Sequence, residues 1–176
     1  MDESLAVIYL SILLALLAVA AFNIFRQILK TRKTESALSR LLSKLSQDKG
    51  TAQEYYELGS IYLDKKVYSQ AIAQLQKAIK AAEQEGEENI ALIYNALGFA
   101  YFGQEQYDLA IRNYKEALKH DPSYITALNN LGHVYERKNL MAQALEVYEQ
   151  VLQSDPKNTT AKRRADLLRR RLVTST

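Results

Sequence analysis

The side chains that most often carry catalysis are sparse in this chain. Its 176 residues include two histidines and no cysteine, so thiolate chemistry and disulfides have no source. His120 falls at an expected helix end and His133 inside another expected helix, and neither belongs to a metal-binding spacing such as H-E-x-x-H. The acid pair Glu87 and Glu88 lies in a short acidic stretch and is interpreted as solvating charge. No nucleophile elbow or phosphate-binding glycine loop is present, so the sequence predicts no enzyme, metal or cofactor.

A second set of residues suits recognition of another protein. Large apolar groups on an exposed face mark interaction surfaces, and asparagine amides can hydrogen-bond a peptide backbone. The alternative is that the chain folds over these residues and buries them as ordinary core. The candidate partner-binding residues are Tyr56, Leu63, Leu92, Asn95, Phe99, Phe102, Asn129 and His133.

These candidates are positioned by a repeated pattern. Counted from Ala91, residues of characteristic types stand at places 4, 7, 8, 11, 20, 24, 27 and 32 of a 34-residue unit. The residues found there are Tyr94, Leu97, Gly98, Tyr101, Ala110, Tyr114, Ala117 and Pro122. This is the tetratricopeptide repeat (TPR) signature, which folds as two antiparallel helices. Small residues allow close helix crossing, so Gly98 and Ala110 are expected to mark the contact inside the hairpin.

The same template fits twice more. The expected units are TPR 1 at 52–85, TPR 2 at 91–124 and TPR 3 at 125–158, with an insertion at 86–90 because Gly98 follows Gly59 by 39 residues. Three repeats are about the minimum for a stable solenoid. In this architecture the first helix of each pair lines the concave face, which is where the partner-binding candidates lie. The predicted fold is all-α, with a transmembrane helix, a three-repeat α-solenoid and a capping helix at 159–172.

A 21-residue uncharged stretch, 5–25, precedes the repeats. As a helix it spans roughly 31 Å at about 1.5 Å per residue, enough to cross a bilayer. A cleaved signal peptide and a buried soluble helix are the alternatives. Signal peptides begin with basic residues, whereas this stretch follows Asp2 and Glu3 and precedes Arg26 and Lys30. A retained anchor is therefore preferred, with the repeats on the cytoplasmic side by the positive-inside rule.

Charge is segregated along the chain. The connector at 26–50 is basic and carries an apolar stripe of leucines, which suits either a degenerate half-repeat capping the first hairpin or an amphipathic helix on anionic lipid. The repeats are acidic and the tail is basic again. The tail's candidate contacts with lipid or an acidic partner are Arg163, Arg164, Arg169, Arg170 and Arg171. A solvated face is the simpler interpretation, and nucleic acid is not expected because no aromatic residues interleave with the charges.

One known use of this architecture is disfavoured. TPR domains that hold chaperone tails grip a terminal carboxylate with lysine, arginine and asparagine side chains at five fixed places. The residues at those places here are Tyr56, Ser60, Ala96, Thr126 and Asn130, and none matches.

The combination of anchor, linker and repeats resembles a known family. The stretches KTRKTESALSRL, EYYELGSIYLDKKVYSQAI and ALIYNALGFAYFGQEQYDLAI resemble the membrane-anchored TPR proteins of cyanobacteria and plastids that assist photosystem I assembly. The resemblance implies a thylakoid location, repeats on the cytoplasmic or stromal side, and transient binding of photosystem I subunits or assembly intermediates. It carries no site residues and no signal for an oligomeric state.

Two other functions also fit the sequence. One is a bacterial envelope interaction module serving secretion, pilus or division machinery. The other is a tether that binds anionic lipid or nucleic acid through the basic tail, for which binding would fall steeply with salt.

Overall fold

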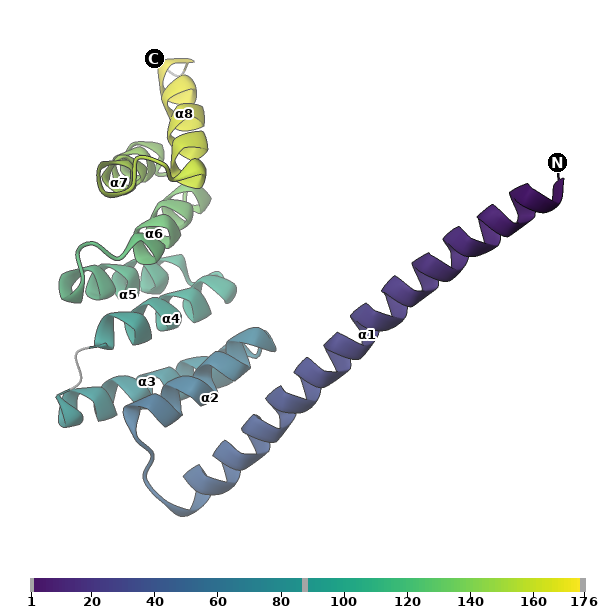
Figure 1. Ribbon diagram of the computed structural model, residues 1–176. Helices are drawn as coiled ribbons and strands as arrows, with labels where there is room; N and C mark the ends of the chain where they lie inside the picture. The colour runs from purple at the N-terminus through teal and green to yellow at the C-terminus, as the bar shows by residue number, and fades with distance from the viewer. Residues whose placement is uncertain (1, 87–88, 175–176) are drawn as a thin grey trace. The chain divides into compact units, whose positions relative to one another are not determined.

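The computed structural model describes residues 2–86 and 89–174, and the regular elements among them are all α-helices (Figure 1). The chain divides into two units, the first ending at Gln47 and the second beginning at Asp48. The helices are α1 (Asp2–Gln47), α2 (Ala52–Asp64), α3 (Tyr68–Glu85), α4 (Ile90–Gly103), α5 (Tyr107–His120), α6 (Ile125–Arg137), α7 (Met141–Ser154) and α8 (Thr159–Thr174).

The first unit is the single helix α1, which runs for 46 residues without a break. The expected anchor and the first part of the expected connector are therefore one continuous helix, which ends three residues before Gly50. Its apolar part is long enough to cross a membrane by length and composition. The polar side chains in that part are satisfied within the helix: the Ser11 hydroxyl donates to the Val7 carbonyl and the Asn23 amide donates to the Val19 carbonyl, each at 2.8 Å. Such internal hydrogen bonds suit a hydrocarbon environment.

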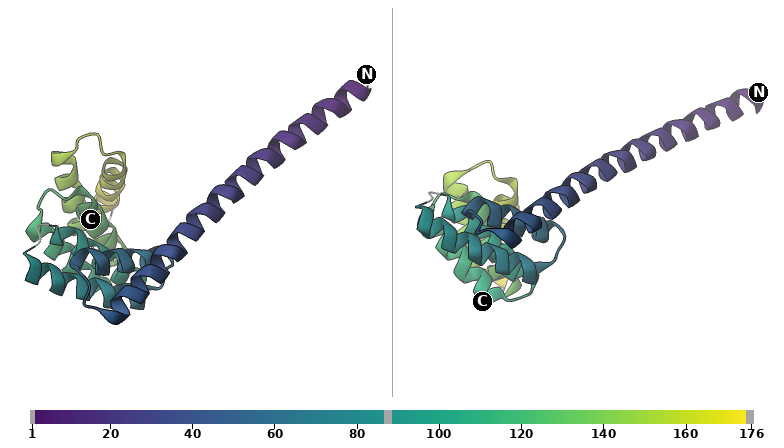
Figure 2. Two further views of the ribbon diagram at one scale, coloured as in Figure 1. Left: turned by 60° about the horizontal axis from the view of Figure 1, so that its bottom comes forward. Right: turned by 90° about the horizontal axis from the view of Figure 1, so that it is seen from below.

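The second unit is a stack of helical hairpins, in which successive pairs lie side by side (Figure 2). The pairs α2/α3, α4/α5 and α6/α7 correspond to the three expected repeats. The extra residues of the first repeat lengthen its second helix, since α3 has 18 residues and α5 and α7 have 14 each. The helix α3 ends at Gly86, whose left-handed backbone (φ 69°) terminates it.

Each hairpin turns by the same device. Lys66, Glu105 and Asn139 occupy the same place in the three repeats, and all have positive φ, between 58° and 59°. The next residue then donates its N–H to a tyrosine carbonyl of the first helix, at 2.8 Å, 3.0 Å and 2.8 Å for the three turns in chain order. These are the bonds of a Schellman-type helix end, repeated in each turn.

Close packing inside each hairpin depends on a glycine, and the side chain nearest to that glycine belongs to a large residue of the second helix. A Cβ added at Gly98 would lie 2.8 Å from ring atoms of Tyr114, and equivalent atoms at Gly59 and Gly132 would lie 2.8 Å from Leu75 and Tyr148. The glycine thus accommodates the large side chain sixteen places later. In TPR 1 the carbonyl oxygen of Ala71, twelve places after Gly59, also lies 3.5 Å from the added atom. Ala110 is fully buried, but it is not the residue nearest to Gly98.

The helix α8 closes the end of the stack. Its buried residues Ala161, Ala165 and Leu168 belong to the same core cluster as Tyr148 and Val151 of α7. The expected capping role of this helix is confirmed, and it extends two residues beyond the expected end.

Candidate protein-binding groove

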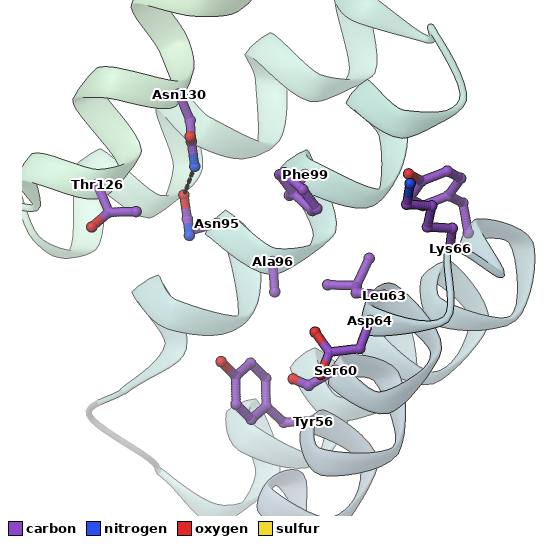
Figure 3. Close-up of a pocket in the computed structure, with 11 residues that line it drawn as sticks. Tyr56, Ser60, Leu63, Asp64, Lys66, Asn95, Ala96, Phe99, Thr126 and Asn130 are labelled. Carbon is purple, nitrogen blue, oxygen red and sulfur yellow. Dashed lines mark hydrogen bonds between the residues drawn. The ribbon is translucent and has the colours of Figure 1, made fainter. Parts of the chain in front are cut away.

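A groove of about 580 Å³ lies between α2 and α4, the first helices of TPR 1 and TPR 2 (Figure 3). The small Ala96 side chain leaves room on the α4 side, and residues from the α2–α3 turn and from α6 close its ends. The lining residues are Tyr56, Ser60, Leu63, Asp64, Lys66, Tyr68, Asn95, Ala96, Phe99, Thr126 and Asn130.

Four of the eight predicted partner-binding residues line this groove: Tyr56, Leu63, Asn95 and Phe99. Phe99 is 44% exposed although it is a large apolar side chain on a well-packed helix. Leu63 approaches from α2 and Phe99 from α4 (Figure 3). An exposed apolar side chain beside a partly buried one in a concave site is a feature of surfaces that bind another protein.

Asn95 plays a different part from the one expected of it. Its side chain is only 9% exposed, its Oδ1 accepts a hydrogen bond from Asn130 Nδ2 at 3.0 Å, and its Nδ2 donates to the Tyr124 hydroxyl at 3.4 Å. The amide therefore joins α4 to α6 and to the segment before α6. Asn130 and Thr126 are the polar groups that the groove presents at that end.

The other four predicted residues lie elsewhere. Phe102 packs against His133, with ring centroids 5.0 Å apart. Leu92 lines a separate hollow of about 260 Å³ next to His120 and Tyr124. The Asn129 Oδ1 atom is buried and has no hydrogen-bond partner in the described part of the chain. The predicted set is thus spread over several places rather than gathered in one.

His133 has a perturbed titration. Desolvation lowers its pKa, and the nearby positive charge of Arg164 lowers it further, while Glu136 opposes the shift. The imidazole is therefore biased toward its neutral form. It packs against the Phe102 ring, and the described residues contain no cluster of three or more His, Cys, Asp or Glu side chains that could hold a metal ion.

The groove has no carboxylate clamp. All five places that grip a terminal carboxylate in chaperone-binding domains line it, and they carry the uncharged side chains Tyr56, Ser60, Ala96, Thr126 and Asn130. The two charged groups that line it are Asp64 and Lys66, of opposite sign. A negatively charged chain end would therefore find little net attraction in the groove.

Several of these lining residues lay outside the predicted set. Ala96 and Asn130 occupy the sixth place of their repeats, one beyond the place assigned to the concave face. Asp64 ends α2, Lys66 lies in the turn that follows, and Tyr68 begins α3. The sequence did hold a signal for Ala96 and Asn130, because both stand at places that grip a peptide carboxylate in chaperone-binding TPR domains.

Two of the five tail arginines hold α8 onto the repeats. Arg164 pairs with Glu136 of α6 at 3.3 Å, and Arg169 pairs with Glu149 of α7 at 2.8 Å and with Asp166 at 3.1 Å. Arg163, Arg170 and Arg171 lie on exposed positions of the helix. The structure thus divides the predicted basic face into a packing side and an outer side.

Family models and solved structures identify the class of protein to which this chain belongs. Tetratricopeptide repeat models match residues 52–85 and 125–158, and a further TPR repeat model matches residues 98–139. Among solved structures, MamA superimposes with a TM-score of 0.71 at 24% identity, covering 79% of this chain and 78% of MamA. The first TPR domain of Spaghetti, solved with an HSP90 peptide, superimposes with a TM-score of 0.64 at 22% identity, covering 72% of this chain and 96% of that chain. The protein is a TPR protein by fold.

Relatives then define the family. The ycf37 protein of Cyanophora paradoxa is 41% identical over 155 residues, covering 88% of this chain and 89% of the relative. The ycf37 protein of Guillardia theta is 36% identical, covering 98% and 97%. The chloroplastic TPR protein PYG7 of Arabidopsis thaliana is 37% identical over 171 residues. The matched region covers 97% of this chain and 56% of PYG7. The chain belongs to the ycf37 family.

Proposed function

We propose that this protein is a membrane-anchored scaffold that holds a segment of another protein in the groove between α2 and α4 while a membrane complex is assembled or stabilised. By resemblance, that complex is photosystem I and the membrane is the thylakoid. The observation that carries the proposal is the exposed Phe99 side chain, with the partly buried Leu63 opposite it, in a groove with little net charge, in a protein whose fold serves protein interaction.

The groove favours an uncharged, apolar segment of its partner. Burial of a large apolar side chain contributes roughly 1.5–3 kcal/mol, so contacts with Phe99 and Leu63 supply the main attraction. Hydroxyl and amide groups of Tyr56, Thr126 and Asn130 lie along the same groove and can pair with the backbone of an extended segment. Such binding should depend only weakly on salt.

The anchor raises the local concentration of the repeats near membrane-inserted partners. Basic residues follow the apolar part of α1, beginning with Arg26 and Lys30, so the positive-inside rule puts the repeats in the cytoplasm or stroma. Protease added to sealed vesicles of native orientation should then leave the repeats intact, and their digestion would contradict this topology.

The test is capture of partners from the native membrane. The tagged protein is extracted in mild detergent and its co-purifying polypeptides are identified, alongside a Leu63→Ala/Phe99→Ala double variant. Leu109→Ala is the matched control, because Leu109 is an exposed leucine of α5 outside the groove. We expect photosystem I polypeptides to co-purify with the wild type and with the control. The amount recovered with the double variant should be at least tenfold lower.

Two outcomes contradict the proposal in different ways. If the double variant captured as much partner as the wild type, the groove would not be the partner-binding site. Recovery of secretion, pilus or division proteins in place of photosystem subunits would remove photosystem assembly and favour the envelope module.

A further inference from the structure

A second pocket, away from the groove, carries an inference that goes beyond the proposed function. Its volume is about 520 Å³, and it lies where the chain enters the first hairpin, between the start of α2 and the last turns of α3. It is lined by Lys49, Gly50, Thr51, Tyr55, Lys77, Lys80, Ala81, Gln84 and Glu85.

Three lysines give this pocket its character. Lys49, Lys77 and Lys80 all line it and are all exposed, and none of the three forms an ion pair with a carboxylate of the described residues. Lysine ammonium groups are common ligands of phosphate-type anions. Three of them gathered around one pocket repel each other, so an anion bound there is stabilised by all three.

Tyr55 supplies a fixed polar group in the same pocket. Its hydroxyl oxygen accepts a hydrogen bond from the Gly50 N–H at 3.2 Å, which leaves its own hydrogen to donate. The Lys77 ammonium lies over the Tyr55 ring, 5.7 Å from its centroid, a cation–π contact that helps to orient the lysine. One hydroxyl donor and three ammonium groups thus line a single pocket.

The acidic residue in the pocket is already engaged. Both carboxylate oxygens of Glu85 accept from the Ala52 N–H, at 3.2 Å and 3.3 Å. The neighbouring N–H groups of Thr51 and Glu54 are also used, in the capping box that starts α2. A ligand therefore meets the lysines and Tyr55 rather than the start of the helix, with two net positive charges from Lys49, Lys77, Lys80 and Glu85 together.

We infer that this pocket binds an oxyanion, of the phosphate, sulfate or sulfonate class. The volume, within the usual range for small-molecule sites, leaves room for the group that bears the anion. The source of the oxyanion is either the headgroup of an anionic lipid or a soluble phosphorylated compound. Both offer the same chemistry to the lysines.

Calorimetric titration of the full-length protein in neutral detergent tests this inference. The probes are inorganic phosphate and dihexanoyl phosphatidylglycerol, with dihexanoyl phosphatidylcholine as the zwitterionic comparison. We expect the Lys49→Gln/Lys77→Gln/Lys80→Gln variant to lose at least tenfold in affinity, and Tyr55→Phe a few-fold. The matched control is Lys115→Gln/Lys157→Gln/Lys162→Gln, which removes the same charge from exposed lysines outside the pocket and should change affinity less than twofold.

Each result decides the inference. Binding of phosphate, of phosphatidylglycerol or of both, with loss only in the pocket variant, supports the site and identifies its source. No binding of either anionic probe, equal binding of phosphatidylcholine, equal loss in the control variant, or no loss in either variant would overturn it. None of the substituted residues lines the groove, so we expect these variants to capture partners normally, and the two proposals fail separately.

Discussion

Asn130 Nδ2 donates a 3.0 Å hydrogen bond to Asn95 Oδ1, and this bond joins the first helices of two successive repeats across the end of the groove. The two residues are 35 positions apart. Because Asn95 is nearly buried, its carbonyl oxygen cannot find a water molecule as a full replacement.

Removal of this bond should therefore destabilise the repeats. We expect Asn130→Ala to lower the free energy of unfolding by about 1–2 kcal/mol, because it leaves a buried acceptor unpaired. Chemical denaturation of the full chain in detergent measures this. Asn129→Ala is the control, since the Asn129 Oδ1 has no described partner to lose; equal costs for the two variants would contradict the role given to Asn95.

The left-handed turns offer a stabilising substitution. Glu105 has φ 59°, which costs a residue with a Cβ about 1–2 kcal/mol. Glu105→Gly should relieve that strain and, after the larger entropy of glycine in the unfolded chain is counted, raise stability by about 0.5–1 kcal/mol. Glu105→Ala removes the same exposed contact with Arg137 but keeps the Cβ, so it should give no gain; a higher melting temperature for the alanine variant would contradict the explanation.

His133 should make stability depend on pH. Its pKa in the folded protein is lowered, chiefly by desolvation, so the unfolded chain binds the proton more readily. The contribution of His133 to folding stability is present above its pKa in the unfolded chain, about 6.5. It is lost as pH falls from there toward the lowered pKa of the folded protein. We expect the difference in melting temperature between pH 7.5 and pH 5.5 to shrink in His133→Gln, with His120→Gln as the control for loss of an imidazole.

Glu136 should hold the capping helix in place. Its carboxylate pairs with Arg164 of α8 and accepts a hydrogen bond of 2.8 Å from the Tyr148 hydroxyl, and burial together with this bond raises the pKa of Tyr148 above its ordinary range. Glu136→Ala leaves both partners unpaired, which costs about 1–3 kcal/mol. Hydrogen exchange in α8 should accelerate at least tenfold, whereas Glu149→Ala, which breaks a more exposed pair with Arg169, should change it little. Unchanged exchange in Glu136→Ala would contradict this role.

The repeats could be predicted from the sequence because their landmarks act locally. A glycine recurs at the same place in all three copies, and Tyr114 and Pro122 recur as Tyr148 and Pro156 in the third copy. Helix periodicity fixes which face each of these residues occupies. The sequence did not indicate which side chain lies nearest to the glycine. Spacing alone identifies small residues that permit a close approach, but side-chain length decides which neighbour fills the space, and here the Tyr114 ring reaches Gly98.

The candidate site was only partly predictable. Leu63 and Phe99 could be placed on the concave face by their position in the repeat, whereas Ala96 and Asn130 entered the groove from the next place along the helix. Asn95 was expected to face a partner, yet its amide is occupied by Asn130 and Tyr124. Hydrogen bonds between successive repeats depend on how the hairpins stack, which no single repeat encodes.

The amino-acid sequence by itself determined the helical hairpins, the long apolar segment and the uncharged character of the clamp places, because each follows from local composition and periodic spacing. Only the tertiary structure decided which amide stays internal, which arginines fasten α8, and that Lys49, Lys77 and Lys80 share one pocket. The physical reason is that such pairings join residues from different helices, and their distances are set by packing rather than by position along the chain.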